Sequence, residues 1–485
     1  KQRTLGSLLS KSNAHFDGSH VLIEASEVAM KFIRDNKESN QILKDAIFEV
    51  AGVRYPIGPW KKKTETDMKR TDIEIMAPVG CMESLHAAIN AGADAIYFGV
   101  GVLNMRAKSA VNFTLDDLAN IVQIAHAAGV KTYLTVNTIL YDNEMEAVRE
   151  VIDRAVKEGI DAVIAADVAA IMYCRKVGME VHISTQCNIS NVEAAEFYAQ
   201  WADVVVLARE LSLEQIASIT QELERRDVRG PRGERLRVEM FAHGALCMAI
   251  SGKCYLSEHE EHCSANRGAC RQICRRKYLL TDVQTGQQLA TDGRYILSPK
   301  DLCTIDFLDK FIAAGVRVLK IEGRARGGEY VKRVVEAYDK ALRLIEAGEY
   351  TRENAEQLKE GLLRVFNRGF WDGYYLGKTI AEWNDCHGSK ATERKVYCGC
   401  TVRYYSKLQV AEFKIEACEL NVGDEILVTG PTTGALRAMV SEIRYDLEPV
   451  DTARQGQRIS IPVPAKVRPK DKLFVIKKIT DDVSA

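Results

Sequence analysis

The sequence has no surplus of charge of either sign. Its 66 lysines and arginines almost balance 67 aspartates and glutamates, so the formal net charge is −1. Such a chain has no overall field that attracts nucleic acid, and a charged partner must therefore meet a local patch. No apolar run reaches the roughly 18 residues of a membrane-spanning helix, and the first residues lack the apolar core of a secretory signal. We therefore expect a cytoplasmic protein with no membrane partner.

The common signatures of proteases and nucleotide-binding proteins are absent as well. The sequence contains no GxSxG, no HExxH and no serine with an evident base. The stretch "FGVGVLN" supplies only a GxG, which is too little for a dinucleotide-binding turn. These absences speak against a serine protease, a zinc protease of the HExxH type and a Rossmann enzyme.

Cysteine, in contrast, is plentiful. Of the 13 cysteines, a single stretch from His243 to Tyr278 holds Cys247, Cys254, Cys263, Cys270 and Cys274. In a reducing compartment such crowding favours metal binding or catalysis over disulfides. The spacing C-x6-C-x8-C-x6-C-x3-C matches paired zinc knuckles poorly, and nearby lysines and arginines would favour thiolates. An iron–sulfur cluster, a zinc site, a nucleophilic cysteine with a neighbouring histidine, and buried thiols all remain open.

The middle of the chain alternates short apolar runs with amphipathic helical stretches. The runs lie at 73–80, 93–100, 130–138, 160–167, 179–186, 202–210, 237–245 and 316–324. Helical stretches that end in glycine just before the next run are typical of βα units. The pattern predicts a TIM-like (β/α) barrel over 73–385, with the cysteine-rich loop 247–278 inserted after the seventh strand. An open doubly wound sheet is the alternative.

The flanking segments predict smaller modules. Residues 1–60 read as a small α+β module of unclear role, and the polar residues 61–72 read as a linker. Residues 393–485 show strands between turn signals and predict a small β-barrel, similar to those of translation factors, which suits RNA contact or a plain accessory role. Because the chain of 485 residues begins at Lys1, we also expect a processed chain or a fragment.

In a barrel, the active face lies at the C-terminal ends of the strands. The polar residues expected at that face are Asn137, Thr138, Asp167, Ser184, Thr185, Gln186, Arg209, Glu210, His243, Glu322 and Arg324. Each of them alone suits a structural role, and their common position makes the set a candidate site. We expect the cysteine-rich loop to cover the same face.

Several motifs in this order resemble the collagenase-like U32 peptidase family. They are "APVGCMESLHAAINAGADAIYFG", "EMFAHGALCMAISGKCYLS", "NRGACRQICRRKY", "VLKIEGRAR" and "FNRGFWDGYYLG", and the resemblance covers roughly residues 73–480. Bacterial members resemble oxygen-independent hydroxylases that carry a 4Fe–4S cluster on four cysteines. The resemblance implies Cys247, Cys254, Cys270 and Cys274 as ligands, whereas Cys263 falls where members commonly carry another residue.

The resemblance further implies a tRNA-modifying hydroxylase that forms 5-hydroxyuridine at the wobble position, with prephenate as hydroxyl source. The expected partners are tRNA, prephenate, an unknown electron donor and a protein partner subunit. Arginine forks suit a dicarboxylate, and Arg209, Arg324 and Arg326 are placed for that at strand ends. We expect catalytic roles for Arg324, Arg209, His243 and Glu322. A peptidase, as the family label says, and a non-catalytic, metal-stabilised RNA-binding protein are the alternatives.

Overall fold

The computed structural model describes residues 13–16, 21–24, 33, 37–51, 57–59, 68–108, 112–289, 295–379, 381–385 and 388–479. The chain divides into two compact units, Lys1–Met68 and Lys69–Ala485. The first unit contains β1 (Asn13–Phe16), β2 (Val21–Glu24), α3 (Lys37–Ala51) and β3 (Ile57–Pro59), with strand order β1-β2-β3. The expected module ends at residue 60, and residues 61–67 of the expected linker lie outside the described residues.

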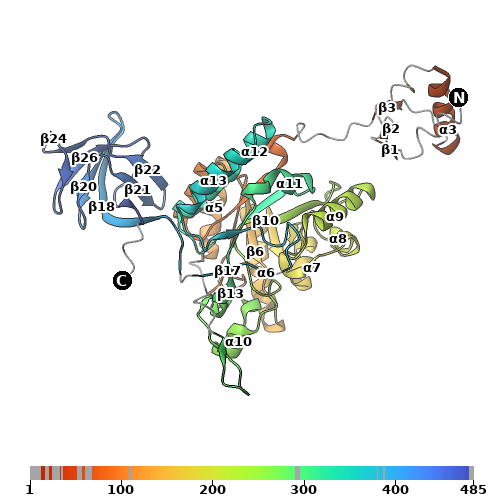
Figure 1. The fold of residues 1–485 in the computed structure, drawn as a ribbon, viewed down its shortest axis with the longest axis horizontal. Helices are drawn as coiled ribbons and strands as arrows, with labels where there is room; N and C mark the ends of the chain where they lie inside the picture. Colours follow the sequence, from red (N-terminus) through yellow and green to blue (C-terminus); the bar gives the residue numbers. More distant parts are fainter. Residues whose placement is uncertain are drawn as a thin grey trace. The chain divides into compact units, whose positions relative to one another are not determined.

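Eight parallel strands form the core of the second unit (Figure 1). They are β4 (Glu74–Pro78), β5 (Ala95–Phe98), β6 (Lys131–Val136), β7 (Ala162–Ala165), β8 (Glu180–Ile183), β9 (Val204–Val206), β10 (Arg237–Ala245) and β15 (Val318–Ile321). Each strand pairs with the next, and β15 closes the ring by pairing with both β10 and β4. All eight coincide with the predicted runs, and the closed ring confirms the TIM-like barrel over the open sheet.

Helices cover the outside of this ring (Figure 1). They include α4 (Met82–Asn90), α5 (Leu118–Ala127), α6 (Met145–Glu158), α7 (Val168–Lys176), α8 (Val192–Ala199), α9 (Leu213–Arg225), α11 (Leu308–Ala313), α12 (Gly328–Glu346) and α13 (Arg352–Leu363). Helix α6 shows why they form: Val148, Ile152 and Ala155 recur on one face and are buried. It ends at Gly159, whose φ of 80° is the left-handed conformation that favours glycine. No helix of the described residues is both long and apolar enough to cross a bilayer.

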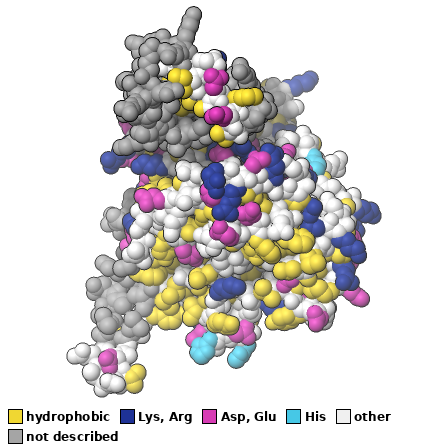
Figure 2. Space-filling view, turned by 90° about the vertical axis from the view of Figure 1, so that its right-hand side faces the viewer, with side chains coloured by type: hydrophobic (Ala, Val, Ile, Leu, Met, Phe, Trp, Pro, Cys, Tyr) yellow, Lys and Arg dark blue, Asp and Glu magenta, His cyan; other side chains and the backbone are white. Residues whose placement is uncertain are grey.

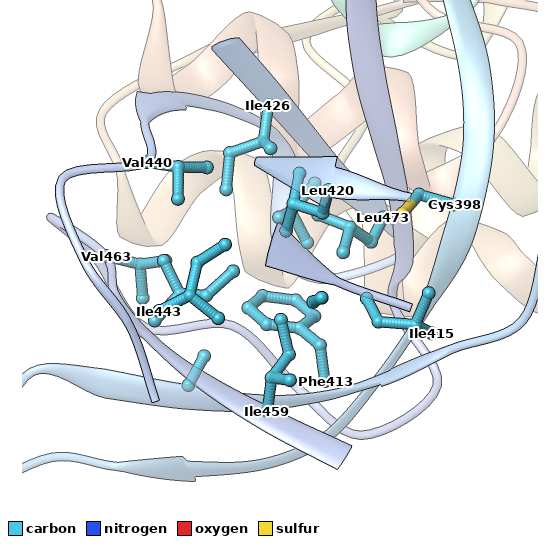
Figure 3. Close-up of a cluster of buried hydrophobic side chains, with 14 of the residues drawn as sticks. Cys398, Phe413, Ile415, Leu420, Ile426, Val440, Ile443, Ile459, Val463 and Leu473 are labelled. Carbon is cyan, nitrogen blue, oxygen red and sulfur yellow. The ribbon is translucent and has the colours of Figure 1, made fainter. Parts of the chain in front are cut away.

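The C-terminal part is an antiparallel sheet with strand order β22-β21-β27-β18-β19-β26-β23-β24. Its strands are β18 (Glu393–Tyr405), β19 (Val410–Ile415), β21 (Glu425–Gly430), β22 (Gly434–Met439), β23 (Ile443–Tyr445), β24 (Glu448–Val450), β26 (Arg458–Pro462) and β27 (Lys472–Lys478). The sheet encloses one apolar core, in which Phe413 lies among Ile415, Ile443 and Ile459 (Figure 3). Strand β22 contacts the helices around the barrel through Arg437, which is ion-paired with Glu329 of α12.

Candidate active site at the C-terminal face of the barrel

The cysteine-rich loop starts where β10 ends, at Ala245, and returns over the C-terminal face of the barrel. The backbone N–H of Lys108, in the loop after β5, donates to the carbonyl of Gly268 at 3.1 Å. The N–H of Ile139, in the loop after β6, donates to the carbonyl of Asn266 at 3.2 Å. Gly268 must be small, because a Cβ there would lie 2.3 Å from the carbonyl oxygen of Asn104. The loop is therefore fixed to the strand ends, where the sequence predicts it.

Four thiols of this loop lie within electrostatic range of one another. Burial raises the pKa of Cys274 to about 11; Arg275 counters the rise, and Cys247, Cys270 and Cys254 add to it. Burial also raises the pKa of Cys254, and Cys247 and Cys270 add to that rise. These four are the cysteines that the family resemblance implies as ligands. Cys263 is half-buried.

The four thiols do not meet at one point. Among the described residues, no group of three or more His, Cys, Asp or Glu side chains is arranged to hold a metal ion. A four-iron cluster makes a different demand, because each thiolate binds its own iron and the ligands surround the cluster. A single zinc ion needs four ligands at one centre, and the described thiols do not form such a centre.

Arg275 holds the base of the loop. Its guanidinium donates to the Ser298 hydroxyl at 2.8 Å, the Pro299 carbonyl at 2.6 Å and the Leu246 carbonyl at 2.7 Å. Burial lowers the pKa of this arginine, and the neighbouring Cys274 and Cys247 partly offset the decrease. Arg275 thus joins three segments beside the thiols and places a positive charge where thiolates would form.

Glu322 is the central carboxylate of the face. Arg106 binds it with Nη2 at 2.6 Å and Nε at 3.2 Å. Burial alone would raise the pKa of Glu322, but Arg106, helped by Arg209 and Arg324, holds it at about 2. The carboxylate is therefore ionised at neutral pH and can only accept hydrogen bonds.

Arg324 is buried and contacts neutral acceptors. Its Nη1 donates to the Asn104 side-chain oxygen at 3.0 Å and to the Thr135 hydroxyl at 2.9 Å. Its guanidinium carbon lies 5.9 Å from the centre of the Tyr97 ring. Burial lowers its pKa to about 10, so it remains charged at neutral pH. A charged group without a carboxylate partner at this depth is poised to bind an anion.

Arg209 and His243, both predicted at the site, lie in different surroundings. Arg209 stacks on Phe241 with 3.5 Å from its guanidinium carbon to the ring centre, and its buried Nε has no hydrogen-bond partner. His243 is 1% exposed, and its ring lies 5.3 Å from Phe370 and 5.7 Å from Tyr338 between centres. Burial lowers the pKa of His243 to about 3. The structure thus brings Arg209 to the charged set and places His243 in an aromatic pocket, where it stays neutral.

Four of the remaining predicted residues divide into two groups, while Thr138 and Thr185 are buried and Glu210 is exposed. Asn137 donates to the Ser184 hydroxyl at 3.5 Å, and Ser184 in turn donates to Gln186, so these three come together. Asp167 instead caps α7 by accepting from the backbone N–H of Ala169 at 2.9 Å, which is a structural role.

The face carries more arginine than carboxylate. Glu322 is paired with Arg106, and Asp301 is paired with Arg368 at 3.1 Å. Four further guanidiniums of this face take part in no salt bridge within the part of the chain that the structure describes: Arg209, Arg275, Arg324 and Arg326. Unpaired positive charge of this density favours the binding of anionic groups. Arg106 was missed from the sequence because it lies in a loop that shows no periodicity, and only its place after a strand could have signalled it. Asp301 was missed because it begins β14 (Asp301–Cys303), a strand too short to give a repeating pattern.

Comparisons with known proteins place these observations in a family. The sequence model of peptidase family U32 matches residues 80–385. A collagenase of Porphyromonas gingivalis is 57% identical over 85% of this chain and 99% of its own length. The tRNA hydroxylation protein P1 of Bacillus subtilis is 35% identical over 56% of this chain and 63% of its own. A 23S rRNA 5-hydroxycytidine synthase of Escherichia coli is 36% identical over 62% of this chain and 45% of its own.

Proposed function

The chain belongs to peptidase family U32, and from that premise we propose that it hydroxylates RNA without molecular oxygen. The specific product we propose is 5-hydroxyuridine at the wobble position of tRNA. One observation carries the proposal: four thiols and four unpaired guanidiniums share one face of the barrel. Two relatives, a tRNA hydroxylation protein and an rRNA hydroxycytidine synthase, support it by their names.

We assign Cys247, Cys254, Cys270 and Cys274 to a 4Fe–4S cluster. When bound, such a cluster supplies electron transfer beside the substrate. The protein's own contribution is to hold the thiols apart on one loop and to place Arg275 beside two of them. A positive charge beside these thiols stabilises thiolates that burial would otherwise keep protonated.

The unpaired arginines suit a dicarboxylate co-substrate, and we propose prephenate as the hydroxyl source. Arg324 is charged and fixed by two neutral acceptors, so its remaining N–H groups can form a fork with a carboxylate. Arg209 has a buried Nε without a partner on the same face. A target base must leave its stack to reach a barrel mouth of this kind, and ionised Glu322 can then accept a hydrogen bond from a base N–H.

A peptidase is the second candidate, since the relative that is 57% identical is named a collagenase. Peptide hydrolysis by a side-chain nucleophile needs a base within hydrogen-bond reach. Between the described residues, no hydrogen bond joins a histidine ring to a serine, threonine or cysteine side chain. His243 stays neutral in its aromatic pocket. The described geometry therefore favours the hydroxylase.

Mass spectrometry of tRNA nucleosides tests the proposal. A strain that lacks this protein should lose 5-hydroxyuridine-type modification, wild-type protein should restore it, and Arg324→Ala should not. Arg149→Ala is the matched control, because Arg149 lies on the outer helix α6 near Tyr173 and away from the face. Unchanged modification in the deletion strain, or enzyme-like turnover of collagen by protein without iron, would overturn the proposal.

A further inference from the structure

A tyrosine at the mouth of the barrel is fixed in place and yet exposed. Tyr141 stands in the loop after β6, four residues beyond Asn137, and 56% of its surface is exposed. The guanidinium carbon of Arg267, from the cysteine-rich loop, lies 3.8 Å from the centre of its ring. This distance means that the guanidinium is stacked on one face of the ring.

The arrangement is held by a network that joins the two loops. Arg267 binds Glu144 with both terminal nitrogens, at 2.6 and 2.8 Å, and also donates to the Ile139 carbonyl at 2.9 Å. Glu144 also accepts a hydrogen bond from the backbone N–H of Tyr141 at 2.8 Å. The same carboxylate therefore fixes both the backbone of Tyr141 and the guanidinium that stacks on its ring. A bidentate pair leaves the guanidinium plane little freedom. The ring is therefore ordered before any ligand arrives.

The two loops that carry Tyr141 and Arg267 also expose apolar side chains. Ile139, Ile250, Met248 and Tyr255 are exposed in the same two loops. Figure 2 shows hydrophobic side chains gathered on the lower part of the viewed face, with lysine and arginine side chains among them. Because Arg267 and Glu144 neutralise each other, the platform does not itself attract phosphate. The unpaired guanidiniums of the barrel face supply that attraction.

We propose that Tyr141, backed by Arg267, is a stacking platform for an unpaired RNA base beside the one that enters the barrel. Aromatic rings and arginine planes are the surfaces on which proteins hold splayed bases. An RNA occupant uses both the ring and the unpaired positive charge of the face, whereas the proline ring of a collagen-like peptide would use only the ring. The inference rests on the proposed function and adds a substrate-binding subsite to it.

The test measures the affinity of the full chain, purified anaerobically, for a fluorescent anticodon stem-loop RNA by anisotropy. A stacked base contributes enough that Tyr141→Ala should weaken binding about five- to 150-fold. Tyr141→Phe keeps the ring and should bind like wild type. The matched control is Tyr173→Ala, which removes a tyrosine whose ring has Arg149 at 5.9 Å on the outer helices; it should have no effect.

Abasic RNA identifies the partner of the ring. Stem-loops that lack one loop base at a time should include one for which wild type and Tyr141→Ala bind equally, because the stacked base is already missing. Equal affinity of wild type and Tyr141→Ala for intact RNA, with wild type still hydroxylating, would overturn this inference alone. A wild-type protein without RNA affinity would overturn the proposed function as well. If Tyr141→Ala weakens the binding of a gelatin peptide but not the binding of RNA, the platform binds protein and the proposed RNA subsite is wrong.

Discussion

Replacing Lys320 with methionine should destabilise the barrel by about 3 kcal/mol. Lys320 Nζ lies 2.6 Å from Glu239 Oε1 inside the barrel, and the two side chains are 7% and 0% exposed. Removing one partner of a buried ion pair typically costs about 3–5 kcal/mol, because the other charge is left without compensation. We expect the lower end of this range of free energy, because His182 remains close to Glu239, with its Nδ1 3.7 Å from Oε2.

Urea-induced unfolding of the full chain, followed by tryptophan fluorescence, measures this change, and Trp201 and Trp371 both report on the barrel unit. The double replacement Lys320→Met with Glu239→Leu should recover most of the loss, because apolar residues of similar volume often replace a buried pair at no cost.

The matched control is the exposed pair of Arg352 and Glu356, whose side chains are 92% and 58% exposed. Arg352→Met should change stability by less than about 0.5 kcal/mol. A loss below about 1 kcal/mol for Lys320→Met, or a double variant no more stable than the single one, would refute the argument that an uncompensated charge is the cause.

Three further predictions concern the candidate site. Arg324→Ala should lower kcat/KM for RNA hydroxylation by about tenfold or more, because a charged hydrogen bond is lost, and the visible absorbance of the cluster should not change. Cys254→Ser should abolish iron binding, measured as iron per chain, whereas Cys263→Ser should retain it; the reverse result would show that the assigned ligands are wrong. Because the pKa of Glu322 is held at about 2, its ion pair should stabilise the fold fully above the unfolded value of 4.5 and be lost as pH falls toward 2. Glu322→Gln should make the acid-side decline shallower in a pH series of thermal melts, and an unchanged decline would contradict it.

The barrel could be predicted because its sequence signals are local and repeated. Each strand is a short run of residues buried on both sides, such as the four of β7, and these runs contrast with the amphipathic helices between them. Helix ends such as Gly159 carry their own signal. The cysteine-rich loop was predictable in place, since it follows a strand whose end lies at the active face.

The charged contacts of the face could not be predicted, because they join loops far apart in the sequence. Arg106 and Glu322 are 216 residues apart, and neither loop has a period that indicates its partner. Asn104 is similar, since it receives Arg324 from 220 residues away. Such contacts form only when the barrel closes, because closure brings loops together that are far apart in the sequence.

His243 shows how one irregularity changes a site. In the pairing of β10 with β15, Phe241 lies opposite Lys320, but His243 lies opposite Ile321, so β10 has an extra residue at this point. A bulge of one residue moves the next side chain to the other face of the strand. The side chain of His243 therefore lies on the opposite side of the strand from Phe241, against the aromatic rings of Tyr338 and Phe370 and away from Glu322.

This bulge has a consequence for the chemistry of the face. The buried groups that remain there titrate far from neutral pH: Glu322 at about 2, Arg324 at about 10, and Tyr97 above its usual value because burial raises its pKa. General-base hydrolysis works best with a group whose pKa lies near the operating pH. Fixed charges instead suit the binding and orientation of an anion. The buried part of the site is therefore better suited to holding an anionic group than to activating a nucleophile against a peptide bond.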